Sequence, residues 1–248
     1  MWWVFEEIKY RLNPANRYDV KLEKELYKKL RKLGYKFFRS EQFNSKTFSE
    51  KDKVVVPLII EYIEKFEHEG IKRQFISSLG VKGFCEATEY LIEQYKKNCY
   101  PNYNQMTLNI VSQTLARICD LRFVDTYLEL LSSNITMEAG YIVEMLGKCS
   151  VEKAIPTLIK LLDCKVILAE NWIGNPLEEH RYYVSQMAIK ALGQFANPEY
   201  IQFIEKFLEP EKLEFITFSD CADKKWLFDT TYRRYKKITQ TAIQQMSK

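Results

Sequence analysis

The sequence predicts an all-α protein, a right-handed α-solenoid of about five helix pairs with an N-terminal helical cap. Hydrophobic residues make up 46% and charged residues 28% of the 248 residues, which is ordinary for a folded domain. The 8 glycines and 7 prolines are too few for the many turns of a β-sandwich or barrel. A helical pattern also recurs along the chain, which predicts a stacked array of repeats.

The repeat is centred on a leucine near the end of a helix. Four segments align on Leu79, Leu115, Leu146 and Leu192, at periods of 36, 31 and 46 residues, and a glycine follows three of these leucines. Apolar or tyrosine side chains stand four residues before, twelve after and sixteen after each one: Phe75, Val111, Ile142, Ala188; Leu91, Tyr127, Leu158, Ile204; Tyr95, Leu131, Leu162, Leu208. These spacings place the side chains on one helical stripe, and each period accommodates two helices and a turn.

The elements follow in order from this register. Residues 1–52 are expected to form the N-terminal cap, with a charged helix near Asp19–Leu33 that Gly34 stops. Residues 53–248 are expected to form the repeat array, which is continuous with the cap as one structural domain. First helices are predicted near 53–66, 84–97, 121–132, 151–163 and 198–208, and second helices near 68–79, 104–119, 136–148, 180–195 and 230–247.

Turn residues support several of these boundaries. Ser49 or Asp52 can cap the helix at 53–66, and Ser150 can cap the helix that starts at Val151. Asn197-Pro198 ends one helix and begins the next, because proline suits a first helical turn.

Three segments indicate the type of repeat. Segment 151–163 contains Ala154-Ile155-Pro156 and resembles the first helix of a HEAT repeat, including its kinking proline. Segment 187–193, Met-Ala-Ile-Lys-Ala-Leu-Gly, resembles a second helix, and segment 54–60, Val-Val-Val-Pro-Leu-Ile-Ile, is similar to another first helix. The resemblance covers residues 53–208 well and 230–247 weakly, although the acidic-then-basic junction pair of HEAT repeats is mostly missing. It implies a solenoid that binds other macromolecules, with second helices lining the concave face.

Charge and cysteine usage narrow the class of partner and the compartment. Net charge is +6 over residues 1–53, −7 over 54–221 and +5 over 222–248. The acidic middle disfavours a nucleic-acid groove along the array and leaves nucleic acid as an alternative at the basic ends. The six cysteines form no Cys-x-x-Cys pair, no apolar run reaches 18 residues, and the start of the chain lacks a secretory signal. We therefore expect reduced thiols, no membrane span and a cytoplasmic, bacterial-type protein.

The predicted binding face lies on the second helices, away from the core stripe. It holds Arg73, Gln74, Ser77 and Ser78; Asn109, Ile110, Gln113, Thr114 and Arg117; Gly140, Tyr141, Glu144 and Met145; and Gln186, Met187, Lys190 and Ala191. Amides and small residues suit a protein partner better than the rows of lysine and arginine that phosphates require.

Long aromatic loops predict a second contact region on one rim of the array. The loops Asn98–Tyr103, Cys164–Glu179 and Glu209–Asp229 are uneven, and the longer two contain Trp172 and Trp226. Long loops are often functional, and tryptophan is a favoured interface anchor. The alternative is that these loops fold back and bury their own aromatic side chains.

Residues for chemistry are sparse. The two histidines, His68 and His180, have no second histidine or cysteine at metal-ligand spacing. No Walker loop, dinucleotide fingerprint, nucleophile elbow or His-Glu-x-x-His is present. We therefore predict no catalytic residue, no metal and no cofactor.

The leading hypothesis is a non-catalytic adaptor or scaffold that binds a protein partner. Two alternatives remain: a nucleic-acid-binding HEAT-like protein, such as a DNA glycosylase-like enzyme, and an immunity-like protein that holds a toxin. The glycosylase alternative would use Arg73, Arg117, Tyr141 and Glu144.

Overall fold

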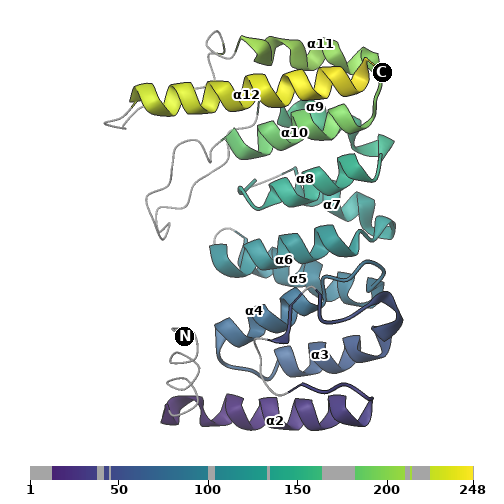
Figure 1. Ribbon diagram of the computed structural model, residues 1–248, viewed down its shortest axis with the longest axis vertical. Coiled ribbons are helices and arrows are strands. Elements are labelled where there is room, and N and C mark those ends of the chain that lie inside the picture. The colour runs from purple at the N-terminus through teal and green to yellow at the C-terminus, as the bar shows by residue number, and fades with distance from the viewer. Residues whose placement is uncertain are drawn as a thin grey trace. The chain divides into compact units, whose positions relative to one another are not determined.

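The computed structural model describes residues 13–37, 42–44, 46–99, 104–132, 135–163, 182–209, 213 and 224–247. Every regular element in these ranges is helical, which confirms the all-α prediction (Figure 1). The chain divides into two compact units, one formed by Met1–Lys97 with Met106–Asp120, the other by Asn98–Gln105 with Leu121–Lys248. None of the helices in the described ranges combines the length and apolar character needed to cross a bilayer.

The first unit contains the predicted cap helix and two predicted helix pairs. Its helices are α2 (Arg17–Lys32), α3 (Val56–Ile63), α4 (Glu69–Ser78), α5 (Thr88–Asn98) and α6 (Gln105–Ile118). Gly34, at φ +94°, follows α2 as predicted. Ser49 and Asp52 form a capping box at the start of the 3-10 helix η3 (Glu50–Val55), which leads into α3.

The second unit contains the remaining predicted helices. They are α7 (Val124–Leu130), α8 (Ala139–Lys148), α9 (Ile155–Leu161), α10 (Tyr183–Gln194), α11 (Ile201–Ile204) and α12 (Lys224–Met246). The helices α7, α9 and α11 each follow a short 3-10 helix: Leu121–Phe123, Glu152–Ala154 and Pro198–Tyr200. In the first unit, α3 and α5 begin in the same way. All five predicted first helices therefore begin with a 3-10 helix that leads into an α-helix.

The aligned stripe forms the core of both units. All four aligned leucines are fully buried, and so are the residues four before and twelve after them. Of the residues sixteen after, Leu208 is half-buried and the other three are buried. The register read from the sequence therefore matches the burial of the chain.

Each repeat has a residue with the left-handed backbone conformation at the same position. The residues four after the aligned leucines are Gly83, Cys119, Ser150 and Ala196, and all have positive φ. A residue in this conformation ends a helix and turns the chain toward the next one. The prediction that Ser150 caps the following helix is wrong, because Val151 occupies the N-cap position there. Asn197 does cap its 3-10 helix, accepting the backbone N–H of Glu199 at 2.9 Å.

Glycines after the aligned leucines allow second helices to approach closely. A Cβ built on Gly147 of α8 would lie 2.5 Å from Ala191 Cα of α10. One built on Gly193 of α10 would lie 2.8 Å from Ala242 Cα of α12. Only a residue without a Cβ fits these positions, so backbone contact fixes the stacking of α8, α10 and α12 (Figure 1).

The segment between α2 and α3 contributes aromatic side chains to the first unit. Phe43 is buried, with its ring centroid 4.6 Å from that of Phe37 and 4.5 Å from that of Phe75 on α4. Asp19 on α2 is 3% exposed and accepts the backbone N–H groups of Glu67 and His68 at 2.9 and 2.8 Å. Because these donors stand at the start of α4, Asp19 caps that helix from a distance in sequence.

Two sequence predictions are corrected here. Residue 226 was expected in a loop ending at Asp229, but α12 begins at Lys224 and includes it. No glycine or proline interrupts residues 224–230, so the helix extends into the expected loop. The expectation of reduced thiols is wrong for Cys119 and Cys149, which are disulfide-bonded. The position of a cysteine in the sequence does not report whether its sulfur meets another in space.

Candidate partner-binding face

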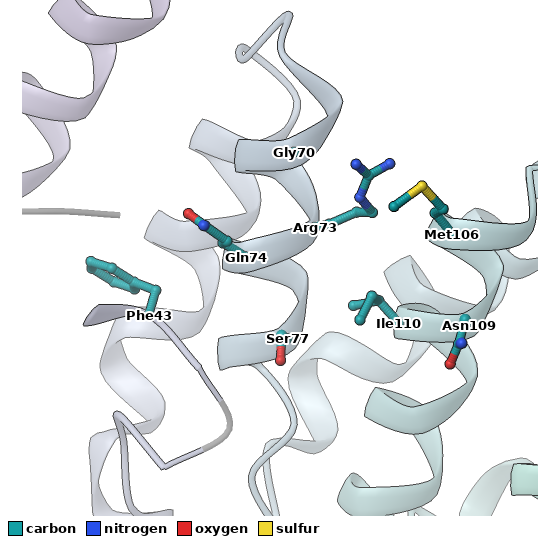
Figure 2. A pocket seen from close by; sticks show the side chains of 8 residues that line it. All are labelled: Phe43, Gly70, Arg73, Gln74, Ser77, Met106, Asn109 and Ile110. Atoms are coloured by element: carbon teal, nitrogen blue, oxygen red, sulfur yellow. The ribbon is translucent and has the colours of Figure 1, made fainter. Parts of the chain in front are cut away.

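A cavity of about 420 Å³ lies between α4 and α6 within the first unit. It brings together five residues of the predicted face, namely Arg73, Gln74, Ser77, Asn109 and Ile110. Sequence reasoning missed the other three lining residues, Phe43, Gly70 and Met106. Figure 2 shows Arg73 extending from α4 toward Met106 on α6, while Gln74 lies on the Phe43 side. Met106 and Gly70 were identifiable from the helical spacing, whereas Phe43 comes from the irregular segment before α3.

The α4 wall of the cavity presents unsatisfied polar groups. Arg73 is half-buried, and no carboxylate in the described ranges pairs with its guanidinium. The Oε1 atom of Gln74 is buried without a hydrogen-bond donor in the described part of the protein. A buried carbonyl oxygen without a donor costs about 1–3 kcal/mol. A ligand that supplies an N–H group would remove that cost.

The α6 wall carries a row of linked polar side chains. Gln113 Nε2 donates to Asn109 Oδ1, and Arg117 donates from its guanidinium to Gln113 Oε1 at 3.2 Å. These residues are spaced by four, so they lie on one face of the helix. No carboxylate in the described ranges neutralises Arg117 either. The row therefore ends at Arg117, an exposed cation that donates to an amide oxygen.

Apolar side chains complete the cavity. Met106 is 53% exposed, which is high for so large an apolar side chain, and Ile110 is half-buried beside it. Figure 2 shows Ile110 projecting from α6 toward α4. Methionine is flexible and adapts its shape to a partner.

The second unit presents a different face on α8 and α10. Glu144 on α8 forms ion pairs with Lys190 on α10 at 2.7 Å and with Lys148 at 2.9 Å. Burial alone would raise the pKa of the Glu144 carboxyl, but the hydrogen bonds from Lys190 and Lys148 outweigh it and lower that pKa. The predicted site residues Glu144 and Lys190 therefore bind each other.

Tyrosines flank this ion pair. Tyr141 is half-buried on α8, and Tyr183 on α10 lies against Gly140, where a Cβ would come within 2.5 Å of its ring. Burial, together with Tyr141 and Glu144, raises the pKa of Tyr183 to about 12. The Tyr183 phenol is therefore a neutral hydrogen-bonding group at neutral pH.

Several predicted face residues are buried instead. Gln186 is only 1% exposed, so it cannot lie on an open surface. The others are Ser78, Thr114, Gly140, Met145, Met187 and Ala191. Four of these, Ser78, Thr114, Met145 and Ala191, immediately precede an aligned leucine. Two of the four lie against the glycine that follows an aligned leucine, Ala191 at Gly147 and Thr114 at Gly80, which explains their burial.

The side chains of the two aromatic anchors of the predicted rim lie outside the described part of the protein. Trp172 lies outside the described residues, as does His180. For Trp226 the backbone is helical, and its side chain lies outside the described part. The rim therefore stays a prediction.

The described residues are suited to binding a partner through charge, hydrogen bonds and apolar contact. Among them, no group of three or more histidine, cysteine, aspartate or glutamate side chains converges to hold a metal ion. The α4–α6 groove, which we define by the cavity residues Arg73, Gln74, Ser77, Met106, Asn109 and Ile110, presents a cation, amides and apolar groups together. Gln113 and Arg117 continue its α6 side beyond the cavity. No protein-family model matches this chain, and no curated protein shows significant similarity to it.

Proposed function

We propose that this chain is a non-catalytic, HEAT-like helical-repeat protein that binds a protein partner in the α4–α6 groove. The observation that carries the proposal is a cavity in which the Arg73 guanidinium and the Gln74 carbonyl oxygen both lack partners in the described ranges, beside the exposed Met106. A side chain that serves stability alone is expected to have its buried polar groups satisfied.

The repeat architecture supports the proposal. The aligned leucines, the left-handed residue after each repeat and the glycine contacts recur at matching positions in both units. Stacked helix pairs with this regularity typically present their second helices as an extended binding surface. We therefore assign the role of adaptor or scaffold to this protein.

A protein partner is favoured over nucleic acid by the composition of the groove. Two arginines do not supply the several phosphate contacts on which nucleic-acid affinity depends. The exposed Met106 and the half-buried Ile110 offer apolar contact instead. Such a mixture of apolar, arginine and amide side chains is typical of protein interfaces.

Site-specific photocrosslinking tests the proposal in cells. A benzophenone amino acid at Met106 is compared with one at Tyr18, which is 50% exposed on α2 and serves as a matched control. We expect a discrete protein adduct at position 106 that is absent at position 18 and is lost when Arg73→Glu is added. Equal labelling at both positions, or an adduct that nuclease digests, would contradict the proposal.

A further inference from the structure

Arg73 is the one cation among the described residues that line the cavity between α4 and α6. It is half-buried, and no carboxylate in the described ranges pairs with it. The preceding residue differs, because Lys72 forms an ion pair with Glu69 at 2.9 Å. A half-buried cation has lost part of its hydration, so an anion from outside the chain would stabilise it.

The Arg73 guanidinium lies at one end of the cavity. Its Nη2 atom is 3.9 Å from the point where a Cβ on Gly70 would stand, so the side chain folds back toward the first turn of α4. Figure 2 shows it directed toward Met106, in the first turn of α6. The positive charge of the cavity is therefore concentrated where these two first turns face each other.

The second arginine of this region lies elsewhere. Arg117 is exposed, and its Cδ atom is 3.2 Å from the point where a Cβ on Gly80 would stand, after the C-terminal end of α4. It donates to Gln113 and does not line the cavity. The cavity thus offers one positive charge. A single carboxylate matches that charge, whereas a phosphoryl group carries close to two negative charges at neutral pH.

Hydrogen-bonding groups in the rest of the cavity suit a peptide backbone. Asn109 Oδ1 accepts from Gln113, which leaves the amide nitrogen of Asn109 to donate to a carbonyl oxygen of a ligand. Gln74 lies on the other side of α4, toward Phe43, and its carbonyl oxygen requires an N–H donor (Figure 2). A peptide backbone supplies both an N–H and a carbonyl at every residue except proline.

Apolar side chains stand beside the guanidinium. Met106 is 53% exposed, and Ile110, one turn later on α6, is half-buried. A segment that places an acid on Arg73 therefore brings a neighbouring side chain against Met106 and Ile110. An apolar residue at that place gains from burial.

We propose that the α4–α6 groove, in its role as the protein-binding surface put forward above, holds a partner segment that crosses α4 and presents one acidic side chain to Arg73. The carboxylate of an internal aspartate or glutamate forms two parallel hydrogen bonds with the guanidinium. An apolar neighbour of this acid packs against Met106 and Ile110, and a backbone N–H donates to Gln74.

NMR of the arginine side chains in the full chain tests the charge of the ligand. The probes are capped pentapeptides, acetyl-Ala-Leu-X-Leu-Ala-amide, with glutamate, glutamine or lysine at X. We expect the glutamate peptide to shift the Nε–Hε resonance of Arg73 and to bind about tenfold more tightly than the glutamine peptide, which corresponds to a contact of about 1.4 kcal/mol. The glutamine peptide with a free C-terminal carboxylate distinguishes a terminal from a side-chain acid.

Variants locate the carboxylate within the groove. In Arg73→Gln, the glutamate and glutamine peptides should bind equally. Lys72→Gln and Arg117→Gln are matched controls, because Lys72 is already paired and Arg117 lies outside the cavity, and both should keep the tenfold difference. In Arg73→Glu, the preference should reverse, with the lysine peptide bound more tightly than the glutamate peptide. Because a reversed preference requires an intact groove, it also shows that this variant folds.

The outcomes separate this inference from the proposed function. Equal binding of the glutamate and glutamine peptides, tighter binding of the free-carboxylate peptide, a larger Arg73 shift with inorganic phosphate, or loss of the tenfold difference in Arg117→Gln overturns the acidic-segment inference. If the Met106 crosslink still captures a protein in that case, the binding function stands and only the ligand chemistry is wrong. If neither crosslink nor peptide binding is found, both proposals fail.

Discussion

Replacing Gly147 by alanine tests whether backbone contact between α8 and α10 sets the stacking of second helices. The added Cβ would lie 2.5 Å from Ala191 Cα, 2.6 Å from Ala191 Cβ and 3.0 Å from the Ala191 carbonyl oxygen. All three atoms are fixed by the backbone of α10. A change of side-chain rotamer therefore cannot relieve the contact, and the helices must separate.

Two opposing terms set the size of the effect. Alanine favours a helix over glycine by about 1 kcal/mol. Non-bonded carbons prefer about 3.5–4.0 Å, so α8 and α10 must part by more than about 1 Å at this point. Overpacking of this kind costs about 1–3 kcal/mol, with rigid backbone at the upper end. We expect Gly147→Ala to lower the free energy of unfolding by about 2 kcal/mol.

The matched control is the same substitution at Gly70 on α4. There the added Cβ would meet the ring of His68, an exposed side chain that can rotate away. Gly70→Ala should therefore be neutral or stabilising by up to about 1 kcal/mol. Urea denaturation followed by circular dichroism compares the variants. Hydrogen exchange should show lost protection in α8 and α10, with α4 unchanged. If Gly147→Ala proves as stable as Gly70→Ala, the register of α8 on α10 is incorrect.

Three further predictions concern stability and redox state. Asp19→Asn should destabilise the protein by about 1–2 kcal/mol in urea denaturation, because it weakens the cap at the start of α4; an unchanged midpoint would contradict this role. The pKa of Glu144 is lowered in the folded state. The stability that its ion pairs contribute is therefore present above the unfolded pKa of about 4.3 and is lost as pH falls through the folded pKa. Glu144→Gln should therefore be less stable than the parent at pH 7, with a difference that shrinks as pH falls below about 4.3, and a constant difference would exclude the ion pairs as its cause. Without reductant, Cys119 and Cys149 should resist alkylation in denaturant, and labelling of both would show reduced thiols.

The helical register could be predicted because it depends on local spacing. The positions of Leu79, Leu115, Leu146 and Leu192 fix which side chains face inward on each helix, and burial follows that pattern closely. Glycine after three of them was visible as well. What glycine does there could not be seen, because the close approach of Gly147 to Ala191 arises only when two helices pack.

The lining of the α4–α6 cavity was predicted in part for the same reason. Arg73 and Asn109 lie on the outward side of single helices, so helical spacing alone locates them. Phe43 reaches the cavity from an irregular segment, which no periodicity describes. Gln186 has the spacing of an exposed residue but is buried. Neighbouring elements decide such cases, and a sequence pattern does not report them.

The two units differ in whether the charged side chains of their candidate faces form ion pairs. In the second unit, Glu144 already binds Lys190 and Lys148, so these three charged groups need no external partner. In the first unit, Arg73 and Arg117 have no carboxylate in the described ranges. Arg73 is half-buried and Arg117 is exposed, so the cost of an unpaired cation falls on Arg73, and a bound anion would offset it. We therefore expect recognition to be anchored in the α4–α6 groove, with an affinity that falls as salt screens its arginine.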